Sequence, residues 1–363
     1  MSSIGSVKEN LEIEKRISIT PETVKKFTSQ GFSINLEKKY GEHLGINDEE
    51  YKKNGANTNI TKEEVFEKSD IILKVNGPSN AEVDLMKSKS ILIAQFDPNL
   101  YKDAISKFSK KDIKFFSLNL LPRITRAQSM DVLSSQANLA GYKAVIESFS
   151  KFEKAIPMMM TAAGTIPPAK VLVVGAGVAG LQAIATAKRM GAIVFATDVR
   201  AASKEQVESL GGKFLNIESA ENLENEGGYA KEASEDFKKK QESVLSETLK
   251  KIDIVICTAL IPGKKAPLII KESMIKKMKP GALIYDLAAS QGGNAAFTQV
   301  DKIVDKDGIR IMGERNILNK LPVSASNLYA KNLFNFVSNL YDEKNNKINI
   351  NLEDEIIKKT LIK

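Results

Sequence analysis

The segment Lys170-Val-Leu-Val-Val-Gly-Ala-Gly-Val-Ala-Gly-Leu181 sets the fold of the second half of the chain. A short apolar strand ends at Val174, and the pattern Gly-x-Gly-x-x-Gly from Gly175 to Gly180 then opens an apolar helix. The first glycine makes the tight turn, the second lets the backbone approach a pyrophosphate, and the third lets the helix pack closely against the strand. Unpaired N–H groups at the helix N-terminus favour phosphates. The segment therefore predicts the first unit of a dinucleotide-binding domain.

An acidic residue follows the next predicted strand. That strand runs from Ile193 to Thr197, and Asp198 ends it, eighteen residues after Gly180. A carboxylate at this place can accept both hydroxyls of the adenosine ribose, whereas it would repel the 2′-phosphate of NADP. The acid therefore favours NAD(H) as the bound cofactor. It argues against the alternative interpretation, a glycine-rich turn that binds no ligand.

Strand-like and helix-like stretches alternate along both halves of the chain. The short apolar runs are Phe32–Leu36, Ile71–Val75, Ile91–Phe96, Ile113–Leu118, Val171–Val174, Ile193–Thr197, Ile252–Thr258, Ala282–Leu287 and Ile309–Met312. The amphipathic stretches between the first four are Pro21–Ser29, Lys62–Lys68 and Tyr101–Ser109. Apolar runs separated by helices indicate parallel sheets that are covered on both faces. The predicted fold class is α/β, with two Rossmann-like, doubly wound parallel-sheet domains joined by long helices.

The joining helices are predicted over Ser129–Lys154 and Ser324–Tyr341. A chain that enters and leaves its second domain through long helices can return to complete its first. We therefore predict a discontinuous N-terminal domain of residues 1–130 plus 325–363, and an NAD(H)-binding domain of residues 131–324.

The composition excludes several kinds of chemistry. One cysteine excludes an internal disulfide, and one histidine excludes any metal site that needs two imidazoles. We predict no metal site. The net charge is +8, from 53 Lys and Arg against 45 Asp and Glu, but the excess is lysine scattered on predicted helix faces. We predict no nucleic-acid partner and no transmembrane segment in this chain.

Five segments together carry a family resemblance. They are the glycine loop, Glu14-Lys-Arg-Ile-Ser-Ile-Thr-Pro21, Lys74-Val-Asn-Gly-Pro78, Arg126-Ala-Gln-Ser-Met-Asp131 and Thr258-Ala-Leu-Ile-Pro-Gly263. In this combination the sequence resembles the superfamily of alanine dehydrogenase and nicotinamide nucleotide transhydrogenase, from about residue 10 to residue 340.

The groups that mark the dehydrogenase branch are missing. Alanine dehydrogenases carry a catalytic histidine just after the strand that here ends in Gln95 and Phe96, and an aspartate where this sequence has Ser290. The single histidine, His43, lies in a turn-rich stretch and is predicted to be exposed. Oxidative deamination needs a proton acceptor and a group that activates water. The resemblance therefore favours the transhydrogenase branch.

Two alternatives stay open. Arg16 and Lys74 are retained, so an amino-acid pocket and an alanine-dehydrogenase-like NAD-dependent activity form one of them. The other alternative is a non-catalytic NAD-sensing module.

The segment from Arg123 to Asn138 resembles the part of transhydrogenase alpha subunits that holds the nicotinamide ring. The resemblance implies that the ring-side, catalytic residues are Arg123, Gln128, Asp131 and Ser134. Asp131 and Ser134 are three apart and share one face of a helix. The alternative interpretation is a capped helix start with a surface ion pair.

The segment from Glu226 to Glu232 resembles the mobile loop that closes over nucleotide in the same subunits, with Tyr229 over the ligand. A glycine turn before a solvated helix is the alternative. The complete predicted nucleotide-binding set is Gly175, Gly177, Val178, Ala179, Gly180, Asp198, Val199, Arg200, Gly228, Tyr229, Ala259 and Leu260.

The transhydrogenase resemblance implies hydride transfer from NADH bound here to NADP+ bound on a partner subunit, coupled through membrane subunits to proton translocation. The implied enzyme is a proton-translocating NAD(P)+ transhydrogenase of the Si-Re, AB-specific type. Hydride transfer between two nicotinamides needs no histidine base. The sequence ends at Lys363 without an apolar span, so we expect the split form. We expect a cytoplasmic homodimer attached to the inner membrane through its membrane and NADP-binding partner subunits.

Overall fold

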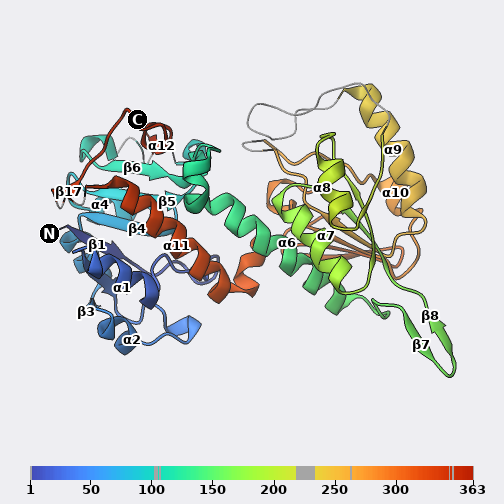
Figure 1. Ribbon diagram of the computed structural model, residues 1–363, viewed down its shortest axis with the longest axis horizontal. Helices are drawn as coiled ribbons and strands as arrows, with labels where there is room; N and C mark the ends of the chain where they lie inside the picture. The colour runs from blue at the N-terminus through green and yellow to red at the C-terminus, as the bar shows by residue number, and fades with distance from the viewer. Residues whose placement is uncertain are drawn as a thin grey trace. The chain divides into compact units, whose positions relative to one another are not determined.

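Two mostly parallel sheets organise the computed structural model, which describes residues 2–101, 105, 108–217, 234–261, 264–342, 344–345 and 347–362 (Figure 1). Each sheet has seven strands within these residues and belongs to one of two units. Unit 1 comprises residues 1–136 and 318–363, and unit 2 comprises residues 137–317. The predicted fold class, two α/β domains with doubly wound sheets, is confirmed.

The sheet of unit 1 has the order β18-β6-β5-β4-β1-β2-β3. Its strands are β1 (Ser3–Ser6), β2 (Ser33–Glu37), β3 (Ala56–Ile60), β4 (Ile71–Asn76), β5 (Ile91–Gln95), β6 (Lys114–Ser117) and β18 (Leu361–Ile362). All neighbours are parallel except β18, which pairs antiparallel with β6. The end of the chain thus completes the edge of the first sheet.

Strand β1 lies inside this sheet but was not predicted, because Ser-Ile-Gly-Ser contains no apolar run. All four of its residues are buried, and Ile4 pairs with both Ile34 and Ile71. A Cβ atom on Gly5 would lie 2.3 Å from the Ser69 hydroxyl oxygen, so only glycine fits there. The Ser6 hydroxyl is satisfied by a 2.7 Å bond to a backbone carbonyl of β4. Close packing selects small residues here over apolar ones.

The helices of unit 1 are α1 (Pro21–Ser29), α2 (Asp48–Lys53), α3 (Lys62–Lys68), α4 (Asn80–Leu85), α11 (Pro322–Leu340) and α12 (Glu355–Thr360). The predicted bounds of α1 and α3 are confirmed, and most of the predicted helix at 101–109 lies outside the described residues. Helix α11 buries Tyr329, Leu333, Phe336 and Leu340 at spacings of three and four, which places one face of the helix in the core of unit 1.

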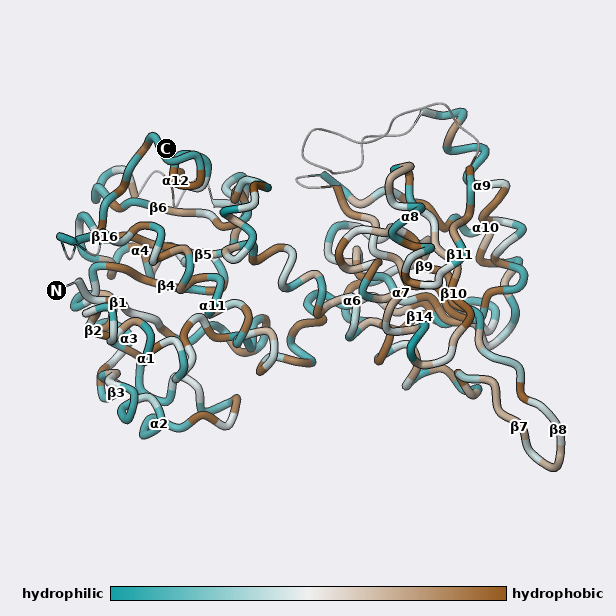
Figure 2. Tube along the Cα trace, in the orientation of Figure 1, coloured by the Kyte–Doolittle hydropathy of each residue, from teal (hydrophilic) through white to brown (hydrophobic). Residues whose placement is uncertain are grey.

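The sheet of unit 2 has the order β11-β10-β9-β12-β13-β15-β14. Its strands are β9 (Lys170–Val174), β10 (Ile193–Thr197), β11 (Lys213–Phe214), β12 (Ile254–Cys257), β13 (Leu283–Asp286), β14 (Lys302–Lys306) and β15 (Ile309–Gly313). Figure 2 shows β9 and β10 as strongly hydrophobic. Among the described strands of this sheet, only β14 is antiparallel to its neighbour, which is β15. Strand β14 was not predicted, because it is an exposed edge strand with charged ends, Lys-Ile-Val-Asp-Lys.

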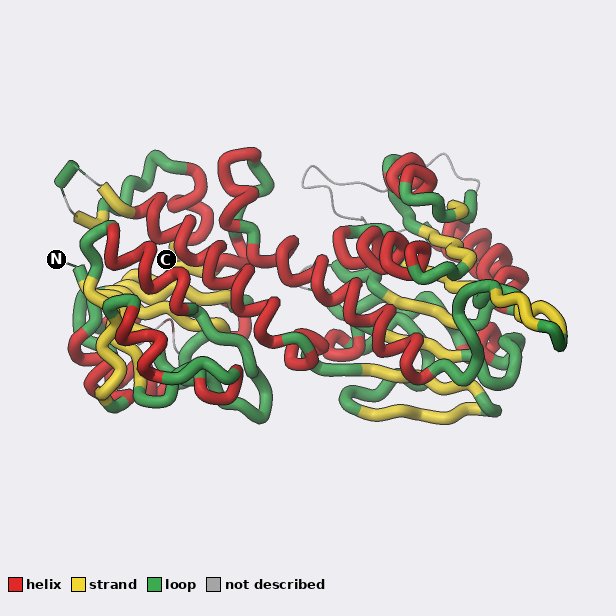
Figure 3. The backbone as a smooth tube through the Cα atoms, turned by 60° about the horizontal axis from the view of Figure 1, so that its bottom comes forward, coloured by secondary structure: helices red, strands yellow, loops and turns green. Residues whose placement is uncertain are grey.

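The remaining helices are α6 (Val132–Lys151), α7 (Val178–Arg189), α8 (Ser203–Ser209), α9 (Glu235–Leu249) and α10 (Glu272–Ile275), and two small hairpins are β7 (Met159–Thr161) with β8 (Gly164–Ile166) and β16 (Tyr341–Asp342) with β17 (Lys347–Ile348). Figure 3 shows the β7–β8 hairpin extending away from the sheet of unit 2.

The predicted domain boundaries differ by a few residues from the division of the structure. Residues 131–136 and 318–324 were predicted in the second domain and fall in unit 1. The Gln136 side chain accepts a bond from Arg16 and donates to the Ala325 carbonyl, which ties the start of α6 into unit 1.

Candidate functional site

The glycine turn after β9 has the geometry of a cradle. Gly175 adopts a φ of +95°, and a Cβ atom there would lie 2.8 Å from the Thr258 hydroxyl oxygen. A Cβ atom on Gly180 would lie 1.9 Å from the Gly175 carbonyl oxygen. A Cβ atom on Gly177 would meet nothing within 4 Å. The first and third glycines are therefore required by packing, whereas the second faces open space through which a ligand can approach the backbone.

The N-terminus of α7 faces the same turn. Gly177 is the N-cap residue, and no side chain caps the helix. The N–H groups of its first turn therefore have no side-chain cap, and they carry the positive end of the helix dipole. Val178 is 37% exposed at the start of the helix. This is the arrangement that suits a pyrophosphate group.

Asp198 lies beside this turn and is bound by Arg200. The Ala176 N–H donates to Asp198 Oδ2 at 2.7 Å, and the Arg200 N–H donates to Oδ1 at 2.9 Å. The Arg200 guanidinium also donates to both oxygens, each at 2.9 Å. Four bonds from described residues fill the acceptor positions of a carboxylate. Ribose hydroxyls can reach both oxygens only when the Arg200 side chain moves aside, a condition that the sequence did not indicate.

The end of β12 lies next to the end of β9, which carries the glycine turn, and β10 with Asp198 lies on the other side of β9. The Thr258 hydroxyl donates to the Gly175 carbonyl at 2.8 Å, and the Ala259 N–H donates to the Asn294 side chain at 3.0 Å. Leu260 is 41% exposed. The structure therefore brings the glycine turn, Asp198 and residues 258–260 together at the carboxyl ends of neighbouring strands. Asn294 was not predicted, since its only signal in the sequence is its position after two glycines.

The predicted ring-side residues all lie in unit 1. Gln128 is exposed in a 3₁₀ helix over Thr125–Met130, and Arg123 is exposed in the loop before it. The Asp131 carboxylate accepts the Ser134 N–H at 2.9 Å and also the Ser134 hydroxyl. Asp131 therefore caps the start of α6, which begins at Val132 and not at the predicted residue 129. The capping contacts leave the proposed contact with a nicotinamide ring as a prediction.

Part of the predicted set lies outside the described residues. It comprises Gly228 and Tyr229, with the whole of the predicted mobile loop from Glu226 to Glu232. Val199 directly follows Asp198 in the sequence. Ala179 lies within the first turn of α7.

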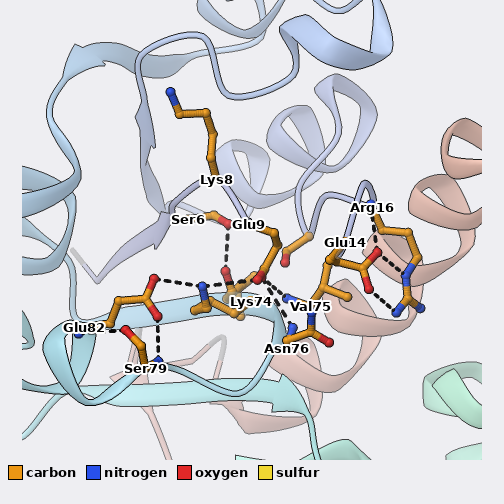
Figure 4. Close-up of polar contacts among 12 residues, drawn as sticks. Ser6, Lys8, Glu9, Glu14, Arg16, Lys74, Val75, Asn76, Ser79 and Glu82 are labelled. Atoms are coloured by element: carbon orange, nitrogen blue, oxygen red, sulfur yellow. Dashed lines mark hydrogen bonds and ion pairs between the residues drawn. The ribbon is translucent and has the colours of Figure 1, made fainter. Parts of the chain in front are cut away.

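Lys74 is enclosed by carboxylates of its own unit (Figure 4). Its ammonium nitrogen lies 3.1 Å from Glu82 and 3.4 Å from Glu9, and all three side chains are less than a tenth exposed. Glu9 also accepts backbone N–H groups at the end of β4, the nearer at 2.8 Å. Burial raises the pKa of Glu82, but the charge of Lys74 and the hydrogen bond from Lys62 outweigh it and lower that pKa to about 2. Lys74 therefore has no uncompensated charge for a substrate.

Arg16 is compensated in the same way. Its guanidinium donates to both oxygens of Glu14, at 2.9 and 2.8 Å, and to the Gln136 side chain at 2.9 Å. Its central carbon lies 5.6 Å from the centre of the Tyr329 ring. Both cations that could recognise an amino acid are thus paired with carboxylates inside unit 1.

Two further residues bear on deamination, His43 and Gln95, and both lie within the part of the chain that the structure describes. His43 is exposed, as predicted, and its Nε2 atom lies 2.8 Å from the Lys15 carbonyl oxygen. Gln95 stands at the end of β5, and its buried side-chain oxygen has no partner among the described residues. An amide cannot accept a proton at neutral pH as an imidazole does.

Family models match both halves of the chain. The Alanine dehydrogenase/PNT N-terminal domain matches residues 5–140, and the Alanine dehydrogenase/PNT C-terminal domain matches residues 144–363. Over 366 aligned residues, the chain is 47% identical to the NAD(P) transhydrogenase subunit alpha of Rhodospirillum rubrum, in the first of the parts into which that subunit is divided. The alignment covers 99% of this chain and 95% of that protein.

Solved structures show the same relationship. The transhydrogenase from Sinorhizobium meliloti is similar with a TM-score of 0.88 and 44% identity, over 99% of this chain and 98% of that one. An L-alanine dehydrogenase has a TM-score of 0.80 at 20% identity, over 99% of this chain and 94% of that one. The second likeness is one of fold alone.

Proposed function

Because the chain belongs to the alanine dehydrogenase/PNT family, on the branch of the transhydrogenase alpha subunits, we propose that it binds NADH and passes a hydride to NADP+ held by a partner subunit. The observation that carries this proposal is the cradle after β9. Gly175 and Gly180 are required by packing, Gly177 faces open space, and Asp198 lies at the adjoining strand end. These residues fit the pyrophosphate and the adenosine ribose of a dinucleotide.

The proposed reaction moves one hydride between the two nicotinamides and no proton at their ring carbons. The C–H bond at C4 of the reduced nicotinamide breaks with its electron pair, and a C–H bond forms at C4 of the oxidised nicotinamide of NADP+. NADH becomes NAD+, and NADP+ becomes NADPH. The contribution of this chain is to hold one ring at near-attack distance from the other, which is a matter of orientation. The proposed ring-side residues are Arg123, Gln128, Asp131 and Ser134.

The proposed choice of NADH over NADPH depends on Asp198. A 2′-phosphate on the ribose would place a charge of about −1.5 to −2 next to the Asp198 carboxylate, and the two would repel each other. The Arg200 guanidinium is held by the same carboxylate, with both contacts at 2.9 Å, and it has to move aside before ribose hydroxyls can bind there. The preference for a nucleotide without the 2′-phosphate is therefore assigned to the Asp198 carboxylate itself.

The proposed partners are an NADP-binding subunit and membrane subunits that couple transfer to proton translocation, with a homodimer of this chain attached to the cytoplasmic side of the inner membrane. None of the helices in the described ranges is both long enough and apolar enough to span a bilayer. The β7–β8 hairpin supports assembly with another chain, because Met159, Met160 and Ile166 are 46%, 78% and 40% exposed.

An alanine-dehydrogenase-like activity is disfavoured by a specific arrangement. The two cations available to an amino-acid carboxylate, Arg16 and Lys74, are already paired with carboxylates of the chain at 2.8 to 3.4 Å. Gln95 and Phe96 stand where that branch has its histidine, and Ser290 stands where it has its aspartate. The remaining alternative, an NAD-sensing module, would bind NADH without supporting transfer.

The deciding experiment mixes the purified chain with an NADP-binding transhydrogenase domain and follows reduction of NADP+ by NADH. We expect transfer that requires both polypeptides. NADH formation from L-alanine by the chain alone would instead support the dehydrogenase. Tight NADH binding without transfer to any NADP-binding partner would support the sensing module.

A further inference from the structure

Asn294 links the turn after β13 to the loop after β12, beside the nucleotide-binding turn. Its side chain is fully buried. The side-chain oxygen accepts the Ala259 N–H at 3.0 Å, and the side-chain nitrogen donates to the carbonyls of Ala259 and Pro267 at 2.8 and 2.9 Å. The backbone carbonyl accepts the N–H groups of Ile269 and Ile270. One amide therefore satisfies both backbone groups of Ala259, a residue 35 positions away in the sequence.

Asn294 is held in turn by Asp286, the last residue of β13. The Asp286 carboxylate is fully buried and accepts the N–H groups of Ala288, Asn294 and Ala295 at 2.9, 2.7 and 3.0 Å. It also accepts the Thr298 hydroxyl at 2.7 Å. Four donors surround one carboxylate, so the turn after β13 is fixed to the strand that it leaves.

The contacts continue to the glycine turn. The residue before Ala259 is Thr258, whose N–H donates to the Val174 carbonyl at 2.8 Å and whose hydroxyl donates to the Gly175 carbonyl at 2.8 Å. Ala176 then donates to Asp198. A continuous series of hydrogen bonds and adjacent residues therefore joins the carboxyl ends of β13, β12, β9 and β10.

We propose that Asn294 is a positioning residue that fixes residues 258–260 against the glycine turn, and that Asp286 holds Asn294 in place for this task. The proposal rests on the proposed function, because the loop that Asn294 fixes is one of the segments that would face the nucleotide. Without the Asn294 side chain, both backbone groups of Ala259 lose their partner. The later part of the loop after β12 keeps its backbone bonds to the turn after β13, from Ala266, Ile269 and Ile270, so the loss is confined to the part of the loop beside the glycine turn.

Two substitutions test this role by NADH binding and by amide hydrogen exchange of the loop after β12. Asn294→Ala removes all three side-chain bonds, whereas Asn294→Asp keeps the side-chain volume and the acceptor for the Ala259 N–H but loses both donors. We expect exchange at residues 258–261 to accelerate in both variants. We also expect the NADH dissociation constant to rise about tenfold, which corresponds to one well-placed hydrogen bond.

The matched control is Asn35→Ala, which removes a buried asparagine of β2 in unit 1 whose amide donates to the Ser69 hydroxyl at 3.3 Å. It should lower the melting temperature while leaving NADH affinity and exchange at residues 258–261 unchanged. Equal loss of NADH affinity in the Asn35 and Asn294 variants would overturn the proposal, because the effect would then be general destabilisation.

A measurement on the unmodified chain covers the case in which the Asn294 variants do not fold. Saturating NADH should slow hydrogen exchange in residues 258–261 and also in residues 288–296, which Asn294 and Asp286 couple to them. Slowing confined to the first segment would contradict the coupling. Failure of the unmodified chain to bind NADH would contradict the proposed function instead, so the two failures are distinguishable.

Discussion

Arg200 binds both carboxylate oxygens of Asp198, with its Nε and a terminal guanidinium nitrogen each at 2.9 Å. The two residues are separated by a single position in the sequence, and both side chains are largely buried, with Asp198 at 7% and Arg200 at 16% exposure. The pair has a consequence for nucleotide choice, because the residue that repels a 2′-phosphate also restrains the residue that could attract one.

Replacement of Asp198 by Ala should weaken NADH binding and strengthen NADPH binding. The ribose loses its acceptor, while the Arg200 guanidinium loses the carboxylate that neutralises it and attracts the 2′-phosphate more strongly. We expect the ratio of the two dissociation constants to change by at least about tenfold, or about 1.4 kcal/mol. Equilibrium titration of both nucleotides measures it. The double variant Asp198→Ala with Arg200→Ala should lose the gain for NADPH; a gain that survives would show that Arg200 is not its source.

The second and third glycines of the turn should respond differently to alanine. Gly177 has a φ of −74°, and a Cβ there meets nothing within 4 Å, so Gly177→Ala should keep the melting temperature of the free chain. The added methyl group would stand in the way of the pyrophosphate, and NADH affinity should fall by about tenfold or more. Unchanged affinity would place the nucleotide elsewhere.

Gly180→Ala serves as the contrasting variant. Its Cβ would lie 1.9 Å from the Gly175 carbonyl oxygen, which belongs to the backbone and cannot turn away. We expect unit 2 to lose about 2 kcal/mol or more of stability, as overpacked sites do. Denaturant unfolding of the ligand-free chain measures this loss, and a stability equal to that of the unmodified chain would contradict the close packing of α7 on the turn.

Gln128→Asn tests orientation separately from affinity. The substitution keeps the amide but withdraws it by one methylene, so an NADH molecule held mainly by the glycine turn and Asp198 should still bind. The rate of hydride transfer should fall much further, since a misplacement of about 1 Å can cost on the order of a hundredfold. Single-turnover transfer and the NADH dissociation constant are measured on the same variant. Equal changes in both would make Gln128 an ordinary binding contact.

Glu82 should influence the acid stability of the chain. Its pKa of about 2 in the folded chain is below its ordinary value of 4.5, so the ionised group is stabilised in the folded state. This contribution is present above about pH 4.5 and is lost as the pH falls from 4.5 toward 2. Glu82→Gln should remove roughly 2 kcal/mol at pH 7 and flatten the dependence of stability on pH in that window. Urea unfolding at a series of pH values measures it; an unchanged slope would refute the ion pair with Lys74.

Local patterns in the sequence were sufficient to predict most of the framework. The helix bounds of α1 and α3 and the strand β10 agree with the structure because their hydrophobic periods and capping residues are contained within each segment. Three strands in the sheet of unit 1, β1, β3 and β18, were missed. Ser-Ile-Gly-Ser and Ala-Asn-Thr-Asn-Ile become strands only because neighbouring strands and a close helix accept their small or polar side chains.

The glycine turn, the acid at the end of β10 and the α/β alternation could be predicted from the chain alone, since each depends on residues that are close together in it. The partners of the charged and polar side chains are decided only by the tertiary structure. The fold pairs Asp198 with Arg200, encloses Lys74 between Glu9 and Glu82, and places Asn294 against Ala259. The physical reason is that a buried polar group must find a partner, and in three dimensions its partner comes from whichever strand end lies nearest, at any distance along the sequence.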